Sequence, residues 1–315
     1  MKLILAFLTL IRSLNLFFIV LTQALFYYCI FPFAFDVENI TVPYTLTPKY
    51  FWLLSAASVL IAAAGYIIND YFDLNIDQVN KPDKLVVDRI IKRRWTIIWH
   101  WVFSFAGVAL SFYIGWKISD WIIGLANAGC VLLLLLYSTT FKKKLLIGNL
   151  IISLLTAWVV MVLFVAEWRP YTINLPDHRL VMSRLFKLAV VYAGFAFIIS
   201  LVREVVKDIE DMEGDARYNC KTMPIVWGVN VCKMFAGVWL VVLMLSILVL
   251  QVYVLQFKWW ASILYSVVFI VAPLAWILVR LYRANSRAEF HSLSNAIKFV
   301  MLTGILSMLF FKLYS

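Results

Sequence analysis

Two short stretches of this chain place carboxylates at the same spacing. The first is NDYFDLNID at residues 69–77, and the second is DIEDMEGD at residues 208–215. In both, aspartates fall at positions i, i+3 and i+7, which share one face of an α-helix. The six residues concerned are Asp70, Asp73, Asp77, Asp208, Asp211 and Asp215. Two such faces in a chain with only 17 acidic residues predict a site that holds a cation.

The expected cation is Mg²⁺, because carboxylates on one helical face are costly to leave alone. Two carboxylates about 6 Å apart repel by roughly 3 kcal/mol at an effective dielectric constant near 20. Mg²⁺ prefers oxygen ligands and is commonly bound by one or two carboxylates together with substrate phosphates. Two facing motifs therefore predict a bridge of carboxylates, Mg²⁺ and a diphosphate. Asn69 adds a neutral oxygen beside the first motif.

Basic residues next to both motifs suit an anionic ligand. Arg203 and Lys207 precede the second motif, Lys81 follows the first, and Lys221 follows the second. Guanidinium and ammonium groups bind phosphate oxygens through charge-assisted hydrogen bonds. We expect these side chains to hold the part of the diphosphate charge that Mg²⁺ does not neutralise.

The alternative interpretation is a pair of solvated acidic patches at helix ends, which would carry no chemistry. A single patch of this kind is usually structural, since ion-pair networks also cluster charge. The matched spacing of two motifs favours function, because ionisable clusters at membrane depth are functional by default.

The elements that position these motifs are predicted to be membrane helices. The 315 residues are 64% hydrophobic with a mean hydropathy of +0.91, whereas soluble domains are about 45–50% apolar. Continuous apolar runs of about 20 residues indicate helices that span a bilayer. Nine spans are expected, at residues 12–35, 49–68, 95–115, 119–138, 148–168, 185–202, 234–256, 258–280 and 294–313. They predict an all-α polytopic membrane protein, with one domain over residues 1–315 and its helices in a single bundle around a central cavity.

The distribution of lysine and arginine predicts the orientation. With the N-terminus in the cytoplasm, most of the 28 basic residues fall in connections on the same side. This agrees with the positive-inside rule and puts both acidic motifs on the cytoplasmic face, in the cell (inner) membrane. The net charge of +11 is then explained by loops that face anionic lipid. It predicts contact with the bilayer and no nucleic-acid partner, and no segment predicts an obligate protein partner.

The four cysteines indicate neither a disulfide framework nor a zinc site. Cys29, Cys130, Cys220 and Cys232 form no CxxC pair and are widely spaced along the chain.

The two motifs resemble the signatures of the UbiA superfamily of membrane prenyltransferases. NDYFDLNID is similar to the first signature, NDxxDxxxD, and KDIEDMEGD followed by KTMPIVWG is similar to the second, DxxDxxxD, and its downstream segment. Tyr137-Ser138 before Lys142, then Gly148-Asn149, also resemble the family. After the first motif the family often carries NRPxRPxxSGR, where this chain has NKPDKLVVDR with lysines in place of both arginines.

The resemblance implies an enzyme that transfers a prenyl group from a prenyl diphosphate, with Mg²⁺ as cofactor. It assigns metal binding to the six aspartates and Asn69, with Asp73, Asp77, Asp208 and Asp211 in catalytic positions. It implies diphosphate contacts from Arg203, Lys207 and Lys142, and it adds Tyr137 to the substrate-binding residues.

The acceptor is predicted to be lipophilic. Arg203-Glu204 leading into the second motif resembles geranylgeranylglycerylphosphate geranylgeranyltransferases, which implies a glycerol-phosphate acceptor and a geranylgeranyl donor. An aromatic acceptor, as in quinone or tocopherol synthesis, is the alternative within the family. A cation-coupled carrier is a further alternative, although carrier sites usually lie near the membrane midplane. A CDP-alcohol phosphotransferase would need a DGxxAR element, which neither motif contains.

Overall fold

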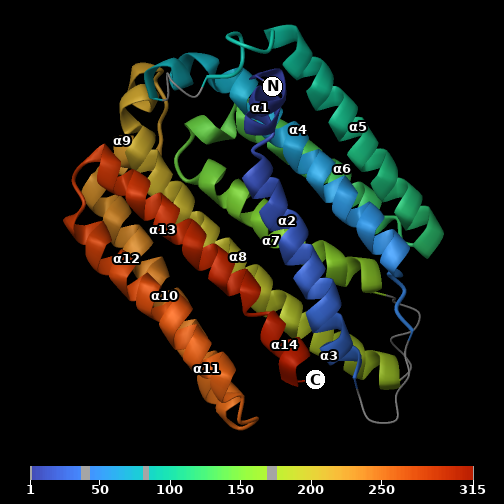
Figure 1. The fold of residues 1–315 in the computed structure, drawn as a ribbon. Coiled ribbons are helices and arrows are strands. Elements are labelled where there is room, and N and C mark those ends of the chain that lie inside the picture. The colour runs from blue at the N-terminus through green and yellow to red at the C-terminus, as the bar shows by residue number, and fades with distance from the viewer. Residues whose placement is uncertain (1, 37–42, 81–84, 169–175, 315) are drawn as a thin grey trace.

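The structure, a computed structural model, describes residues 2–36, 43–80, 85–168 and 176–314. Within these ranges the chain is helical and forms no strand (Figure 1). The helices are α1 (Lys2–Leu10), α2 (Ser13–Leu25), α3 (Phe31–Phe35), α4 (Pro48–Asn80), α5 (Arg93–Ile118), α6 (Ile122–Thr139), α7 (Ile147–Glu167), α8 (Pro176–Arg217), α9 (Met223–Trp227), α10 (Val229–Leu255), α11 (Trp260–Ser266), α12 (Ala272–Arg283), α13 (Arg287–Leu306) and α14 (Leu309–Tyr314).

The prediction of nine membrane spans is confirmed. The described ranges contain nine helical segments that are long and apolar enough to cross a bilayer. Two of them are continuous through a π-helical turn, at Phe26–Ile30 between α2 and α3 and at Val267–Val271 between α11 and α12. The chain is therefore an integral membrane protein of the all-α class.

The two helices that carry the acidic motifs are longer than the sequence predicted. The expected spans ended at residues 68 and 202, whereas α4 continues to Asn80 and α8 to Arg217. Hydropathy falls in both motifs because one face of each helix is acidic. The helix persists in α4 because Leu74 and Ile76 remain buried on other faces.

A separate helix α1 precedes the first span and was not predicted. It joins α2 through Arg12, whose left-handed backbone (φ 51°) turns the chain between the two helices. Ala6 and Leu10 of α1 pack with Ile67 of α4 and Val87 in a small apolar cluster. This cluster holds α1 against the helix that carries the first motif.

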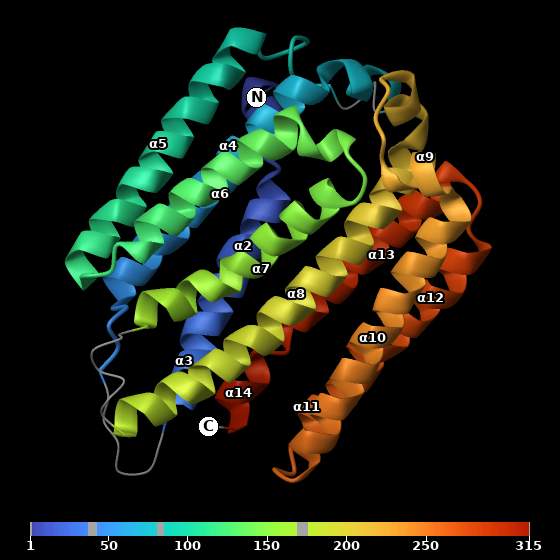
Figure 2. The ribbon, with the colours of Figure 1, turned by 180° about the vertical axis from the view of Figure 1, so that it is seen from behind.

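Two larger apolar clusters hold the bundle together. One contains Phe26, Phe51, Leu163 and Leu185, and therefore joins α4, α7 and α8 to the π-helical turn that follows α2. The other joins α8 to α10, α12 and α13. Seen from behind, α8 runs between α7 and the group of α10, α12 and α13 (Figure 2). Long α8 thus belongs to both clusters and carries the second motif between them.

A buried carboxylate ties the chain before α4 to the end of α7. Glu167 is 2% exposed, and its two oxygens accept the backbone N–H groups of Thr45 and Leu46 at 2.6 and 2.9 Å. The Tyr27 hydroxyl donates to the carbonyl of Leu46 at 2.8 Å. Buried backbone groups need such partners, so this contact fixes the start of α4.

The acidic ends of α4 and α8 lie at the same end of the bundle. Helices α1 and α9 are also at this end, and α11 and α14 are at the other (Figure 1). The arrangement brings two motifs that are far apart in sequence to one side of the molecule.

Candidate active site

A cavity of about 730 Å³ lies between the acidic ends of α4 and α8 and continues into the bundle. Nearly all the predicted site residues line it. These are Asn69, Asp70, Asp73, Asp77, Tyr137, Lys142, Arg203, Lys207, Asp208, Asp211 and Asp215. The structure therefore brings both acidic faces to one space.

Asp73 lies at the centre of a small polar group on the first motif. Its Oδ2 accepts a hydrogen bond from Nδ2 of Asn69 at 2.6 Å, one turn earlier on α4. Its Oδ1 accepts from the ammonium of Lys142, in the turn between α6 and α7. The side chains of Lys142 and Asp73 are only 9% and 16% exposed, so this ion pair is largely shielded from water. A metal at Asp73 would compete with Lys142 for the same carboxylate.

Asp70 is paired with Arg12, which the sequence analysis did not select. Nη2 of Arg12 donates to Oδ1 of Asp70 at 2.8 Å, and the guanidinium lies 5.1 Å from the centre of the Tyr66 ring. Arg12 lines the cavity. In the sequence, Arg12 could be recognised only as a cation at the start of an apolar span. The positive-inside rule already explains a cation at that position, so it did not indicate a site residue.

Asp208 on the second motif is oriented by Asn149 of α7. Nδ2 of Asn149 donates to Oδ2 of Asp208 at 2.8 Å, and Asn149 is 7% exposed. The carbonyl of Asn149 accepts from the Ser153 hydroxyl at 2.6 Å. Asn149 was part of the family resemblance, but no role was predicted for it.

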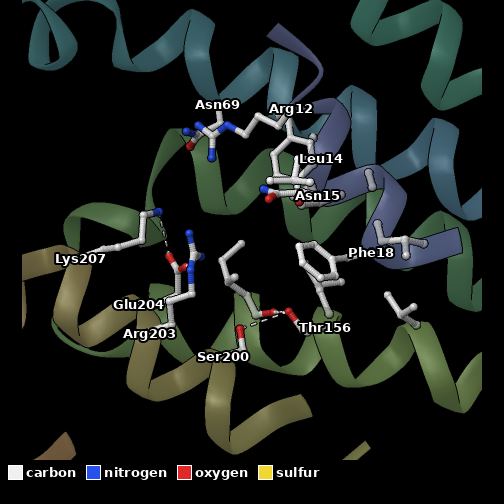
Figure 3. Close-up of a pocket in the computed structure, with 18 of the residues that line it drawn as sticks. Arg12, Leu14, Asn15, Phe18, Asn69, Thr156, Ser200, Arg203, Glu204 and Lys207 are labelled. Atoms are coloured by element: carbon white, nitrogen blue, oxygen red, sulfur yellow. Dashed lines mark hydrogen bonds and ion pairs between the residues drawn. The ribbon is translucent and has the colours of Figure 1, made fainter. Parts of the chain in front are cut away.

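Arg203 and Lys207 share Glu204 as a partner. Nη1 of Arg203 donates to Oε1 of Glu204 at 2.9 Å, and Nζ of Lys207 lies 3.6 Å from Oε2. Figure 3 shows this group reaching into the cavity from one wall, opposite Arg12 and Asn15. Glu204 lowers the net positive charge that the two cations present to an anion, and the sequence analysis had not placed it in the site.

Two predicted residues are not among those that the structure places at the cavity, one because it lies elsewhere and one because it is not described. Lys221 is exposed and is not among the lining residues, although its backbone N–H donates to the carbonyl of Lys143 at 2.8 Å. Lys81 lies outside the described residues. The diphosphate contacts expected of these two lysines stay predictions.

The donor set at the cavity suits Mg²⁺ that is shared with phosphate. Within the part of the chain that the structure describes, no three acidic, histidine or cysteine side chains gather around one point. All the candidate ligands supply oxygen, and Oδ1 of Asn69 is buried without a hydrogen-bond partner among the described residues. This fits a hard cation that takes one or two carboxylates from the protein and its other ligands from substrate and water.

Apolar side chains line the cavity further from the motifs. Phe18 from α2, Leu134 from α6, Phe195 from α8 and Ile305 from α13 belong to this part. A cavity of a few hundred Å³ with polar groups at one end and apolar walls beyond suits an amphiphilic ligand. The polar end can hold a charged head group while the walls shield a hydrocarbon chain from water.

Comparison with known proteins agrees with this geometry. A digeranylgeranylglyceryl phosphate synthase of Methanosphaera stadtmanae is 26% identical over 83% of this chain and 88% of its own length. A solved structure of a digeranylgeranylglyceryl phosphate synthase is 25% identical, with a TM-score of 0.61 over 98% of this chain and 99% of the other.

A more distant structure shares the fold. It is a UbiA homologue from Archaeoglobus fulgidus bound to GPP and Mg²⁺, 13% identical, with a TM-score of 0.55 over 96% of this chain and 99% of that one. The model of the UbiA prenyltransferase family matches residues 40–310, which confirms the resemblance seen in the two motifs. The chain belongs to the UbiA prenyltransferase family.

Proposed function

We propose that this prenyltransferase moves a geranylgeranyl group from its diphosphate to a glycerol-phosphate lipid acceptor, with Mg²⁺ held by the two acidic motifs. The observation that carries the proposal is the convergence of both acidic faces on one cavity with apolar walls. The names of the similar synthases support the choice of donor and acceptor. An aromatic acceptor is the competing possibility within the family.

The acidic and the basic residues of the cavity have different proposed roles. Asp73 and Asp77 of α4 and Asp208, Asp211 and Asp215 of α8 supply the oxygens that would hold the metal, with Asp70 and Asn69 beside them. Bound Mg²⁺ would neutralise the diphosphate as it departs from the prenyl carbon. Lys142, Arg203 and Lys207 line the same cavity and would bind diphosphate oxygens directly.

The transfer step depends on a cavity that keeps water away from the reacting prenyl carbon. The C–O bond between the prenyl C1 and the diphosphate breaks, and the diphosphate keeps the electron pair. The acceptor oxygen forms a new bond to C1, and its proton passes to the released diphosphate rather than to a side chain of the protein. Apolar walls such as Phe18 and Phe195 exclude water that would otherwise capture the prenyl carbon. We assign no general base.

The orientation in the membrane follows from charge. α1 and the acidic ends of α4 and α8 lie at one end of the bundle, together with the short connection that carries Lys142. We infer that this end faces the cytoplasm, in the cell membrane, as the positive-inside rule indicates. The diphosphate would then enter from the aqueous side and the acceptor from the bilayer.

The test is a transfer assay with the purified protein. Labelled geranylgeranyl diphosphate and Mg²⁺ are supplied with geranylgeranylglyceryl phosphate, with an aromatic acid or with no acceptor, each with and without EDTA. We expect product only with the glycerol phosphate and only with Mg²⁺. Product with the aromatic acid and not with the glycerol phosphate would show that the acceptor is aromatic. Transfer in the presence of EDTA would show that the reaction does not need Mg²⁺.

Matched variants locate the site. Asp73→Asn and Asp211→Asn each remove one charge and keep the shape of the side chain, and we expect losses of at least about 100-fold in kcat/KM. Glu213→Gln is the control, because Glu213 lies in the second motif outside the i, i+3, i+7 pattern, is exposed, and pairs with Arg217 at 2.7 Å. Equal activity in all three variants would rule out the acidic faces as the site.

A further inference from the structure

The side chain of Asn80 connects the two acidic motifs directly. Asn80 is the last residue of α4, three positions after Asp77, and it is 5% exposed. Its Nδ2 donates to the backbone carbonyl of Asp211 at 3.0 Å, and its Oδ1 accepts from the backbone N–H of Gly214 at 3.0 Å. One amide thus bonds a donor and an acceptor on α8, both within the second motif.

The contact is so close that only glycine fits on the α8 side. A Cβ at position 214 would lie 2.4 Å from Oδ1 of Asn80 and 2.5 Å from both Cγ and Nδ2. Real Cβ atoms essentially never come this near to another heavy atom, and here all the nearest atoms belong to Asn80. Gly214 therefore permits the approach of α4 to α8 at this level.

A third helix reinforces the junction. Arg287, at the start of α13, donates from Nη2 to the backbone carbonyl of Asn80. The same Nη2 lies 3.9 Å from Oδ1 of Asp211. The end of α4 is therefore bonded to α8 by a side chain and to α13 by its backbone.

A simple helix-ending role does not explain these bonds. Asparagine is common at the C-terminal end of helices, where it relieves the local backbone conformation. A residue with only that role would have no need of partners on another helix. Both side-chain bonds of Asn80 instead cross to the backbone of α8, at Asp211 and Gly214 within the second motif.

We propose that Asn80 is a positioning residue that fixes the separation between the two acidic faces. The proposal rests on the proposed function, in which one diphosphate and its metal ions bridge these faces. Such a bridge has a fixed length, so a change in the separation of the two faces would weaken the binding of the diphosphate and of the metal together. Asn80, Gly214 and Arg287 together form what we call the motif clasp. Its part in catalysis is to hold Asp77 and Asp211 at the distance that the bridge requires.

The kinetic test compares two asparagines on the same helix. Asn80→Ala removes both bonds to α8, whereas Asn75→Ala removes an exposed asparagine one turn earlier. In Asn80→Ala we expect at least a tenfold rise in the KM for prenyl diphosphate and in the Mg²⁺ concentration for half-maximal rate. We expect the KM for the acceptor to stay within about twofold, and Asn75→Ala to behave as the wild type. A uniform loss of kcat in Asn80→Ala, with both KM values unchanged, would overturn the proposal.

A double-mutant cycle tests the contact itself. Gly214→Ala alone places a methyl group against the Asn80 amide, and we expect a rise in the diphosphate KM at least as large as that of Asn80→Ala. The double variant Asn80→Ala with Gly214→Ala removes the clash, so its KM should match that of Asn80→Ala alone. Losses that simply add would show that the two residues act independently.

A distance measurement separates this proposal from the proposed function. Spin labels at Gln78→Cys on α4 and Ala216→Cys on α8 occupy exposed positions, while the four native cysteines are buried. We expect a narrow distance distribution in the otherwise wild-type protein and a broader or shifted one after Asn80→Ala. This measurement does not depend on enzymatic activity. A broader or shifted distribution in a protein that shows no transferase activity would refute the proposed function and still support the motif clasp. An unchanged distribution in an active protein would refute the clasp alone.

Discussion

The ammonium of Lys142 and the carboxylate of Asp73 form a shielded ion pair, although 69 positions separate them in the sequence. Lys142 belongs to the turn between α6 and α7, and Asp73 to the motif face of α4. The pair joins one expected diphosphate contact to one expected metal ligand. A metal that binds Asp73 must displace Lys142 or share the carboxylate with it, and the displaced ammonium can then bind a phosphate oxygen.

This relationship predicts opposite effects on metal and diphosphate when Lys142 is neutralised. In Lys142→Gln the competitor for Asp73 is lost, so Mn²⁺ used as a probe should bind about tenfold more tightly, which corresponds to about 1.4 kcal/mol. The KM for prenyl diphosphate should rise at least tenfold, because one charge-assisted contact is missing. Electron paramagnetic resonance of Mn²⁺ and steady-state kinetics measure the two quantities.

The control for this variant is Lys143→Gln, which has the same charge change at the next residue. The Lys143 side chain is exposed and is not among the residues that line the cavity, and its backbone carbonyl accepts from the N–H of Lys221. We expect both quantities to stay within about twofold. Weaker binding of both metal and diphosphate in Lys142→Gln would contradict the competition.

Asn149 predicts a second effect on the metal site. Asn149→Ala removes the hydrogen bond to Asp208, and groups that orient metal ligands typically contribute 10- to 100-fold in metal affinity or activity. We expect the Mg²⁺ requirement to rise by about this factor. Asn127→Ala is a matched control, because Asn127 bonds Ser111 and Trp158 instead of an acidic residue. It should lower thermal stability and leave the Mg²⁺ requirement unchanged.

The first motif shows which part of the site could be predicted from the sequence. Its spacing predicted that Asp70, Asp73 and Asp77 share a helical face, and the structure places all three at the cavity. The same spacing continues to Asn80, which is ten positions after Asp70 and so falls on that face. Asn80 lies beyond the last carboxylate and outside the NDxxDxxxD pattern, so nothing in the sequence marked it as part of the site. Asn80 contacts α8, and a partner on another helix is decided by packing that the spacing cannot show.

The buried carboxylate of Glu167 predicts a loss of stability far from the motifs. Glu167→Gln replaces one acceptor oxygen by an amide nitrogen, so one buried backbone N–H of Thr45 or Leu46 loses its partner. An unsatisfied buried donor costs about 1–3 kcal/mol. The unfolding temperature in detergent should fall by several degrees, while the KM for diphosphate stays the same.

The comparison for Glu167 is the exposed Glu213. Glu213→Gln should change the free energy of unfolding by less than about 0.5 kcal/mol, as surface substitutions usually do. Equal stability of the two variants would show that the Glu167 contact does not hold the chain before α4.

Cys220 predicts a pH-dependent reaction at the cavity wall. It is 5% exposed and lines the cavity, and burial together with the Asp215 carboxylate raises the pKa of its thiol to about 11. The thiol form therefore dominates below pH 11, and the reactive thiolate increases about tenfold for each pH unit up to that value. Labelling by a maleimide should be slow at pH 7 and should still accelerate in this way between pH 9 and 10, where labelling of a thiol with the ordinary pKa would level off. Mass spectrometry of the labelled peptide measures the rate, and a rate independent of pH would contradict the shift.

Residues outside the motifs were the harder part of the site to predict. Arg12 and Glu204 each carry a charge that has an ordinary explanation in a membrane protein, at a helix start or beside basic neighbours. Their roles depend on which side chains lie opposite, namely Asp70 for Arg12 and the Arg203 and Lys207 pair for Glu204. The sequence predicted the helices because hydropathy is a local property. It could not predict the pair of Arg12 and Asp70, which lie 58 positions apart, whereas Glu204 pairs with close neighbours on α8.

The position of α1 has a practical consequence for protein production. For protein production, the residues that precede the first membrane-crossing helix are often removed. Here Leu8, Thr9 and Arg12 belong to the cavity wall, and Arg12 reaches Asp70 from the turn between α1 and α2. A shortened gene product that starts at Ser13 would keep the nine described segments that are long and apolar enough to cross a bilayer. It would nevertheless lack part of the cavity wall. Inactivity of such a protein would therefore result from the deletion and would say nothing about the activity of the full chain.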